Sequence, residues 1–354
     1  MTLKSTVAVF SGPGQIEFRE IARPTPRPNQ VLVKIKACAI CTVERRAWTG
    51  TRVPRLGEVF VGGHEASGEV VAVGDAVTQG FKCGDRVVMG VGSDCGACYY
   101  CRRGANQRCE HFHSLYSQYY SQYEDLPGLW GFGQYRVVNE NELFKAPGDV
   151  TYEHLSLAEP LACVVHSMRK LDIEIGDDVV IIGCGAMGLL NLMVAKLRGA
   201  RTIVSETDPL RVQKALDAGA NAAVNAGEQD PVERVKALTE GRGANYVIAA
   251  FGSGKVNEQA LQMLDKGGRL MLFAAAYPST PLDLDPNLVH QKELCILGTT
   301  GKDPDDLRIA ARLLSLGIVD VTPVIEAVMP FEDIEKALDL AVAPGSFRVV
   351  LRME

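Results

Sequence analysis

The chain has 354 residues, which is enough for two domains with separate hydrophobic cores. Its formal net charge of −6 argues against nucleic acid or an anionic membrane surface as the main partner. The longest uncharged apolar run, residues 179–195, is interrupted by three glycines and an asparagine, which argues against a membrane span.

The chain contains ten cysteines. The N-terminal residues lack the long apolar segment of a signal peptide, so we expect the protein in the cytoplasm, which is reducing. In that compartment, cysteines are expected to bind metal or to fill the core rather than to form disulfides.

Residues 1–150 read mainly as β-strands. Residues 31–37 alternate apolar and polar side chains, while residues 68–74 and 85–90 form short β-rich runs bounded by glycines. This first part of the chain therefore predicts a β-rich domain.

Four closely spaced cysteines form the strongest single motif: Cys95, Cys98, Cys101 and Cys109. Four thiolates at this spacing can close a tetrahedron around Zn²⁺ and hold a loop that has no core of its own. A redox or disulfide cluster is the alternative. Because four protein ligands leave no open position on the metal, we assign this structural zinc site no catalytic role.

A second possible metal site combines residues that are distant in the sequence: Cys41, His64, Glu65 and Glu159. Cysteine, histidine and carboxylate ligands suit zinc, and three protein ligands plus water leave an open, Lewis-acid site. Each residue alone is ordinary, since a single histidine usually makes structural hydrogen bonds, and Glu159-Pro160 can simply begin a helix. Only the set as a whole predicts a metal centre.

Residues 179–199 predict a strand, a tight glycine turn and a helix. The turn reads Gly183-x-Gly185-x-Met187-Gly188. The first glycine permits the turn, the second lets a pyrophosphate approach the backbone, and the third lets helix and strand pack closely. The helix N-terminus then offers free N–H groups to the anion. An ordinary packing turn between strand and helix is the alternative.

The next strand, residues 202–205, is followed by Glu206, about 20 residues after the glycine turn. An acidic residue there can accept hydrogen bonds from the adenosine ribose and repels a 2′-phosphate, which favours NAD over NADP. Arg211 keeps NADP open, although it is equally compatible with a solvated helix residue.

Two further strands, residues 246–251 and 269–274, continue the alternation of strands and helices. Their ends, near Gly252 and Ala274, are expected to line a cofactor crevice at the carboxyl edge of the sheet. The tail ends in a last strand at residues 346–351.

Together these motifs resemble the zinc-dependent medium-chain dehydrogenase/reductase family, nearest its polyol (sorbitol) and threonine dehydrogenase branch. The resemblance covers essentially the whole chain. The residues that carry it are Cys41, Gly63-His64-Glu65, Gly84-Asp85-Arg86-Val87, the four cysteines, Gly133-Gln134-Tyr135, Glu159-Pro160-Leu161 and the glycine turn.

The resemblance implies an α/β fold of two domains. A GroES-like, β-rich catalytic domain spans residues 1–156 and includes the structural zinc lobe at about residues 93–112. A Rossmann domain, with a doubly wound parallel sheet that binds NAD, spans residues 157–295. Residues 296–354 then return to the catalytic domain. A homodimer or homotetramer is likewise implied by the family.

In that branch, residues matching Cys41, His64 and Glu65 hold the catalytic zinc, and a glutamate matching Glu159 either binds zinc or hydrogen-bonds its water. Relatives of the alcohol branch have a cysteine where this chain has Glu159, so the difference points to polyols. Arg348 matches a position where relatives place a basic residue on the cofactor pyrophosphate. An edge-strand charge is the alternative for Arg348.

The sequence departs from the family just after Cys41. The family usually reads Cys-x-Ser/Thr-Asp, and that hydroxyl relays the substrate proton, but this chain has Val43 at the matching position. Glu44 replaces the aspartate and is expected to orient a ligand. The proton must then pass through zinc-bound water with Glu159 or Glu65, or through a hydroxyl of the sugar or ribose.

The tyrosine-rich segment around Tyr116 and Tyr119 offers ring surface and hydroxyl donors, which a sugar-like ligand would need. In relatives this segment borders the substrate cleft; packing on the zinc lobe or on a neighbouring subunit is the alternative. Trp48 is a further candidate for substrate contact, with core packing as its alternative.

We therefore expect a dehydrogenase with two zinc ions per chain that transfers hydride between NAD(H) and a secondary hydroxyl of a small polyhydroxylated compound: a polyol, a cyclitol or a sugar derivative. One alternative is oxidation of threonine. Arg45 or Arg46 could bind its carboxylate, with a solvated surface position as the alternative for both. Another is a non-catalytic NAD-binding protein, which only the Val43 departure supports. The last alternative is a reductase whose reaction does not involve zinc.

Overall fold

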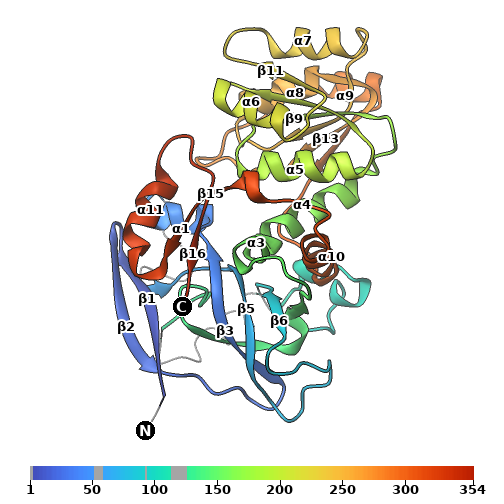
Figure 1. Cartoon of the computed structure of the whole chain (residues 1–354). Coiled ribbons are helices and arrows are strands. Elements are labelled where there is room, and N and C mark those ends of the chain that lie inside the picture. Colours follow the sequence, from blue (N-terminus) through green and yellow to red (C-terminus); the bar gives the residue numbers. More distant parts are fainter. Residues whose placement is uncertain (1–2, 52–58, 92–93, 113–125) are drawn as a thin grey trace. The chain divides into compact units, whose positions relative to one another are not determined.

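The computed structural model describes residues 3–51, 59–91, 94–112 and 126–354. The chain divides into two compact units. The first unit comprises residues 1–162 and 302–354, and the second comprises residues 163–301. Figure 1 shows both as mixtures of strands and helices.

The first unit is organised around a seven-stranded sheet in which β15, β16, β3, β5, β6 and β8 follow one another and β7 also pairs with β3. The strands are β3 (Gln30–Ala39), β5 (Glu65–Val73), β6 (Arg86–Met89), β7 (Tyr135–Asn139), β8 (Leu143–Lys145), β15 (Ile325–Pro330) and β16 (Arg348–Arg352). The predicted strands at residues 31–37, 68–74 and 85–90 are confirmed as β3, β5 and β6.

A smaller sheet in the first unit has the order β2-β1-β4. Its strands are β1 (Lys4–Gly12), β2 (Gln15–Ala22) and β4 (Phe60–Val61). Phe10 on β1 stacks on Phe60 on β4, with ring centroids 4.8 Å apart. These rings belong to a continuous apolar core that also includes residues of β3, β5 and β16.

Helices of the first unit connect and follow these strands (Figure 1). The α-helices are α1 (Thr42–Trp48), α3 (Tyr152–Ser156), α10 (Pro304–Ser315) and α11 (Ile334–Val342), and α4 (Ala158–Leu171) begins here and continues into the second unit. The 3₁₀-helices are η1 (Cys101–Arg103), η2 (Asn106–Arg108), η3 (Glu140–Glu142), η4 (Thr322–Val324) and η5 (Phe331–Asp333).

The second unit contains a six-stranded parallel sheet with the order β11-β10-β9-β12-β13-β14. Its strands are β9 (Asp178–Ile182), β10 (Arg201–Glu206), β11 (Ala222–Asn225), β12 (Ala244–Ala249), β13 (Leu264–Leu272) and β14 (Cys295–Gly298). Counted from β9, this order is the doubly wound arrangement of Rossmann domains, in which ligands bind at the carboxyl edge where the strand order reverses. The predicted fold class is therefore confirmed.

Helices connect the parallel strands of the second unit. They are α5 (Ala186–Leu197), α6 (Pro209–Asp217), α7 (Pro231–Leu238), α8 (Gly254–Gln262) and α9 (Pro286–Lys292). Asp208 and Asp230 precede α6 and α7, and their side chains accept backbone N–H groups of the first turn. An aspartate cap followed by proline fixes each helix start locally.

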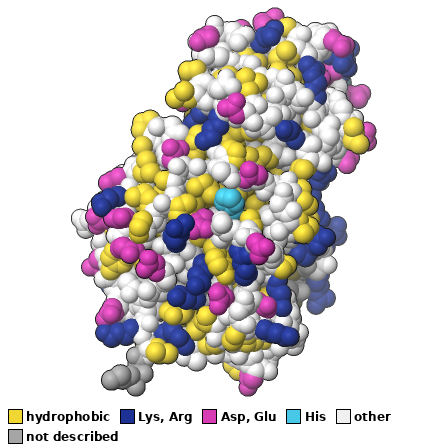
Figure 2. All heavy atoms as spheres, in the orientation of Figure 1, with side chains coloured by type: hydrophobic (Ala, Val, Ile, Leu, Met, Phe, Trp, Pro, Cys, Tyr) yellow, Lys and Arg dark blue, Asp and Glu magenta, His cyan; other side chains and the backbone are white. Residues whose placement is uncertain are grey.

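Acidic and basic side chains are interspersed over the face of the molecule shown in Figure 2. In the part of the chain that the structure describes, no helix is both long and apolar enough to cross a membrane.

Candidate active site

Cys41 lies between strand β3 and helix α1. It is the residue that caps α1, with extended backbone angles φ −86° and ψ 169°. Its backbone N–H donates to Oε2 of Glu44, 3.1 Å away, so the helix that begins here also fixes the backbone of the cysteine. A glutamate on the first turn that reaches back to the capping residue is a standard way to start a helix.

Glu44 joins this helix start to the loop that carries His64. Its Oε1 accepts the backbone N–H of Gly63 at 3.0 Å and lies 3.1 Å from Nδ1 of His64. Burial opposes ionisation of Glu44, but the charge and hydrogen bond of His64 and the Gly63 N–H outweigh it and lower the pKa of Glu44. With Nδ1 held by the carboxylate, Nε2 of His64 is the nitrogen available to a metal.

The backbone before His64 requires glycine. Gly63 has φ +83°, and a Cβ atom there would lie 2.6 Å from the backbone nitrogen of Phe132. The carbonyl of Gly63 accepts the N–H of Gly131 at 2.8 Å, so the loop is held against a neighbouring segment. This glycine therefore permits both the turn and the close approach that places His64.

Glu65, the first residue of β5, is fully buried beside the same cluster. Its Oε1 accepts a hydrogen bond of 2.8 Å from Nη2 of Arg348, the first residue of β16. That Nη2 is also 4.0 Å from Sγ of Cys41. Burial raises the pKa of Glu65, although the charge of Arg348 works in the opposite direction.

The other oxygen of Glu65 supports metal binding. Within the described residues, Oε2 is buried and has no hydrogen-bond partner. A buried carboxylate oxygen without a partner is unfavourable, and a metal ion would satisfy it. Arg348 on Oε1 and a metal on Oε2 would therefore use both oxygens of Glu65.

Glu159, near the start of α4, forms an ion pair with Lys302. Lys302 comes immediately before Asp303, the residue that caps α10. Both side chains are largely buried, with 11% of Glu159 and 9% of Lys302 exposed. Burial opposes ionisation of Glu159, but Lys302 and His64 outweigh it and lower the pKa of this carboxyl. Sequence reasoning missed Lys302 because it lies 143 residues from Glu159 and belongs to no local motif.

These residues form one cluster. Ligand atoms of Cys41, Glu44 and His64 lie within 4.8 Å of one another, and so do those of His64, Glu65 and Glu159. A thiolate, an imidazole and carboxylates suit zinc. With Cys41 ionised and His64 neutral, as metal binding requires, the four anions Cys41, Glu44, Glu65 and Glu159 outnumber the two buried cations, Arg348 and Lys302, by two. A divalent ion would balance this excess. The four residues Cys41, His64, Glu65 and Glu159, called the Cys41 cluster below, therefore fit a zinc ion.

The four cysteines of the predicted structural site also come together. Sulfur atoms of Cys95, Cys98, Cys101 and Cys109 lie within 4.8 Å of one another. Hydrogen bonds from the backbone of Cys101 and Glu110 lower the pKa of Cys98 to about 6, which favours the thiolate that zinc requires. This set can hold zinc in a closed tetrahedron.

In the second unit, the glycine turn connects β9 to α5 as predicted. Gly185 caps α5, and a Cβ atom at Gly188 would lie 2.0 Å from the carbonyl oxygen of Gly183. The helix therefore packs directly on the turn, with Met187 in its first turn. Among the described residues, a Cβ atom at Gly185 would meet only Nη1 of Arg211 within 4 Å, at 3.8 Å, so the backbone there leaves room for a ligand.

Glu206, at the end of β10, braces this turn. Its Oε2 accepts the backbone N–H of Cys184 at 2.7 Å, and its Oε1 accepts that of Thr207 at 2.7 Å. The sequence predicts that Glu206 binds the ribose, but it does not reveal these hydrogen bonds to the backbone of the turn. The ribose contact stays a prediction, as does a phosphate contact for Arg211.

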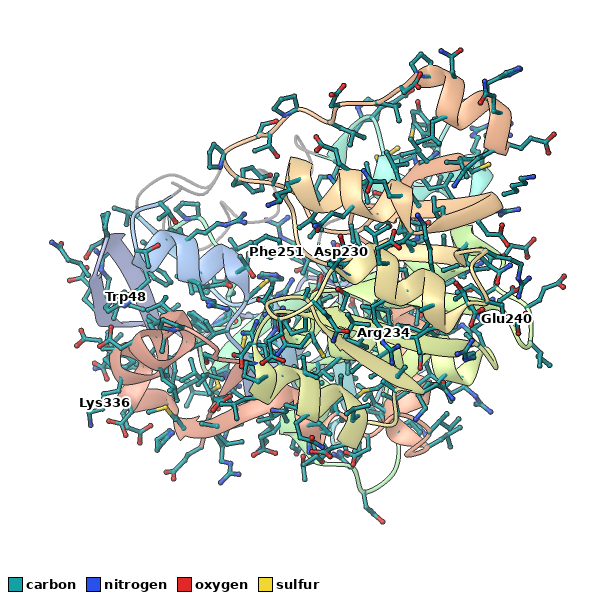
Figure 3. All side chains as sticks on the ribbon, turned by 90° about the horizontal axis from the view of Figure 1, so that it is seen from above. Trp48, Asp230, Arg234, Glu240, Phe251 and Lys336 are labelled. Atoms are coloured by element: carbon teal, nitrogen blue, oxygen red, sulfur yellow. The ribbon has the colours of Figure 1, made fainter. Side chains whose placement is uncertain are left out.

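Gly252 and Ala274 follow neighbouring parallel strands, β12 and β13. A Cβ atom at Gly252 would lie 2.4 Å from the carbonyl oxygen of Ala275, and the N–H of Ala274 donates to Ala249 at 3.0 Å. Phe251, labelled in Figure 3, lies beside Gly252 and is 60% exposed. The structure thus brings both predicted residues to the carboxyl edge of the sheet.

Trp48, labelled in Figure 3, ends α1. Its indole N–H donates to Oδ1 of Asp339 on α11 at 2.9 Å. Its ring also packs against the core of the first unit. A substrate contact for Trp48 stays a prediction. Tyr116 and Tyr119 lie outside the described residues.

Comparisons with known proteins agree with this geometry. Residues 27–148 match the family described as the alcohol dehydrogenase GroES-like domain, and residues 186–315 match the family described as zinc-binding dehydrogenase. The sorbitol dehydrogenase of Halalkalibacterium halodurans is 31% identical over 99% of both chains. The L-threonine 3-dehydrogenase of Pyrococcus horikoshii is 32% identical over 100% of both chains.

A solved structure is similar over the same length. The crystal structure of 2R,3R-butanediol dehydrogenase from Bacillus subtilis superimposes with a TM-score of 0.85 and 26% identity, covering 98% of this chain and 99% of that one. These likenesses extend over both units, and the two family matches together cover parts of each. The chain therefore belongs to the zinc-dependent medium-chain dehydrogenase/reductase family, whose members are oxidoreductases that use zinc and a nicotinamide dinucleotide.

Proposed function

We propose that this dehydrogenase oxidises a secondary hydroxyl of an uncharged polyol, cyclitol or sugar derivative, with NAD as the hydride acceptor. The observation that carries the proposal is the charge pattern of the Cys41 cluster. Arg348 and Lys302, the two buried cations beside it, are each paired with a glutamate of the cluster, and a divalent ion would balance the two remaining negative charges, those of the Cys41 thiolate and of the adjoining Glu44. An uncharged substrate would leave that balance intact.

In this proposal, Cys41, His64 and Glu65 hold the catalytic zinc, and Glu159 binds it or its water. When bound, the ion supplies Lewis acidity that lowers the pKa of the substrate hydroxyl. Glu44 orients His64 and the Cys41 backbone, while Arg348 orients Glu65. Rigid placement of these groups is the contribution of the protein, because it keeps the reacting atoms in a productive geometry.

The second unit would hold the cofactor. The N–H groups at the start of α5 and the open backbone at Gly185 suit a pyrophosphate. Gly252 and Ala274 would border the crevice at the carboxyl edge. When bound, the dinucleotide supplies the hydride acceptor. We propose NAD rather than NADP because Glu206 at this edge would repel the 2′-phosphate of NADP. Arg211 lies nearby and could bind that phosphate, so both cofactors should be tested.

The proton that leaves the substrate needs a route that avoids Val43. This side chain, on the first turn of α1, is 41% exposed and carries no group that can accept or donate a proton. Water or a hydroxyl of the substrate or ribose would have to carry the proton. This route suits a polyhydroxylated substrate better than a simple alcohol.

Oxidation of threonine is the second candidate. The 32% identity to an L-threonine 3-dehydrogenase over the whole chain favours it. A zwitterionic substrate would require a cation for its carboxylate, and the half-buried Arg45 and Arg46 on α1 are the candidates.

The decisive experiment follows the absorbance of reduced nicotinamide while the zinc-loaded protein is offered polyols, cyclitols, sugars, threonine and simple alcohols with NAD or NADP. The proposal predicts turnover of at least one polyhydroxylated compound with NAD. Turnover of threonine alone would establish the second candidate. Dinucleotide binding without any turnover would indicate a non-catalytic protein.

Two further properties belong to the proposal. We expect a homodimer or homotetramer, as in the branch that the chain resembles, and light scattering would measure its mass. We also expect the protein in the cytoplasm, where Cys41 and the four cysteines of the structural site would stay reduced and able to bind zinc.

A further inference from the structure

The buried ion pair between Glu159 and Lys302 differs from an ordinary surface pair. Both side chains are about nine-tenths buried, whereas Lys336, which pairs with Asp333, is 75% exposed. Exposed pairs contribute little, but removing one partner of a buried pair leaves a charge that the interior cannot solvate. Lys302 therefore has a large effect on where the Glu159 carboxylate can lie.

The backbone beside Lys302 is firmly anchored. The N–H of Asp303 donates to Asp306 at 2.9 Å, and Oδ1 of Asp303 accepts the N–H of Gln107 at 2.9 Å. The first contact caps α10, and the second ties the segment to the lobe that carries the four cysteines. The backbone that carries the Lys302 ammonium is therefore held in place on the Asp303 side, unlike that of a mobile surface lysine.

The ammonium contacts one oxygen of a candidate metal ligand. Lys302 donates to Oε1 of Glu159, while a ligand atom of Glu159 lies within 4.8 Å of those of His64 and Glu65. Without the ammonium, the positive charge of the metal would become the strongest attraction on this carboxylate. Glu159 would then occupy the coordination position that a substrate hydroxyl needs.

We propose that Lys302 is a positioning residue that restrains Glu159 at the edge of the Cys41 cluster and so keeps one coordination position of the catalytic metal open. The inference rests on the proposed function, because it takes the cluster as the catalytic zinc site. It goes further by giving Lys302 a role in substrate access to the metal.

The test replaces Lys302 with methionine, which keeps most of the side-chain length but removes the charge. We expect Lys302→Met to lower kcat about 10- to 100-fold, in the range typical for residues that orient metal ligands. We expect its affinity for zinc, measured by competition with a chromogenic chelator, to be unchanged or higher. The visible spectrum of the Co²⁺-substituted protein should shift, because the carboxylate joins the coordination sphere. Co²⁺ bound at the four-cysteine site contributes the same absorption in every variant, so it does not affect the difference between two spectra.

Three further variants give the test its controls. Lys302→Arg keeps the charge and should retain the native Co²⁺ spectrum and most of the turnover. The double variant Glu159→Gln/Lys302→Met removes both charges and should return the spectrum toward that of the native protein. Lys336→Met breaks an exposed pair (Lys336 is labelled in Figure 3) and should change nothing.

A native Co²⁺ spectrum and native turnover in Lys302→Met would overturn the inference. So would weakened zinc binding in that variant, or a failure of arginine to substitute for lysine. The metal readouts need no substrate, so they test Lys302 even if the screen finds no polyol activity. A failed screen with the predicted spectral shifts would reject the proposed substrate and leave the role of Lys302 standing.

Discussion

Glu44 connects the two loops that carry Cys41 and His64. Its two oxygens accept the backbone N–H of Cys41 and of Gly63, and Oε1 also faces His64. The sequence suggests only that an acidic residue here orients a ligand. The structure adds that one buried carboxylate positions both candidate ligands, so its loss should affect the metal before it affects the fold.

We predict that Glu44→Gln lowers zinc affinity by about 10- to 100-fold. An amide has one acceptor oxygen, so its NH₂ group must face either the Cys41 N–H or the Gly63 N–H with His64. Competition with a chelator would measure the affinity, and circular dichroism would check the fold. Glu140→Gln, which alters contacts to the backbone of Thr78 and Gln79, is the matched control. Native zinc affinity in Glu44→Gln would refute this role.

The glycine turn between β9 and α5 is an example of local structure that the sequence predicts correctly. Turn residues act over a few positions, so the spacing of Gly183, Gly185 and Gly188 predicts strand, turn and helix, and β9 and α5 confirm it. The aspartate-proline starts of α6 and α7 are equally local. The bracing contact from Glu206 to Cys184 could not be predicted, because it depends on how β10 lies beside β9.

We predict that Gly188→Ala destabilises the protein by about 1–3 kcal/mol, the usual cost of forcing atoms into a packed site. The added Cβ would lie 2.0 Å from the carbonyl of Gly183, so the turn must move, and dinucleotide binding should weaken. Denaturant unfolding and titration of NADH fluorescence would measure both effects. Gly298→Ala is the control, because a Cβ there meets none of the described residues within 4 Å. Equal behaviour of the two variants would contradict the prediction.

Helix α3 and strand β16 are joined by a hydrogen-bonded ion pair. Nε of Arg352 lies 2.5 Å from Oε1 of Glu153, whose side chain is 13% exposed. Burial opposes ionisation of Glu153, but hydrogen bonds from its own backbone and from Arg352, together with the charge of Arg352, outweigh it and lower its pKa. The stability from a lowered carboxyl pKa is fully present above the unfolded value, about 4.3, and is lost as the pH falls through the lower folded value.

Glu153→Gln should therefore reduce the free energy of unfolding near neutral pH by about 1 kcal/mol or less, because Arg352 is largely exposed. The difference between native protein and variant should shrink as the pH falls below the ordinary carboxyl range. Urea unfolding at several pH values would measure it. A difference that stays constant down to the lowest pH would mean that ionisation of Glu153 is not its source.

The sequence predicts the fold class and which side chains come together in the two candidate metal sites, because their motifs are specific as a set. It does not predict the partners that complete the Cys41 cluster. Arg348 lies 283 residues from Glu65, and Lys302 lies 143 residues from Glu159. Such pairs depend on the chain returning to the first unit after residue 301, and no local pattern records them.

Because the chain returns to the first unit after residue 301, Arg348 contacts a residue that its sequence position alone does not reveal. The resemblance predicts a contact with the cofactor pyrophosphate, whereas the structure shows the guanidinium on Glu65 and near Cys41. An arginine has five N–H donors in a planar fork, so the two roles are chemically compatible. The cofactor contact stays a prediction.

The proposed chemistry requires zinc held by the Cys41 cluster, so the metal dependence of turnover is the first property to measure. Oxidation of a polyhydroxylated substrate would be followed before chelation, after it, and after zinc is restored. We predict that activity disappears on chelation and returns with zinc, and that His64→Ala stays inactive while it still binds NAD. Turnover that survives loss of the metal, or that persists in His64→Ala, would contradict the assignment of this cluster as the catalytic centre.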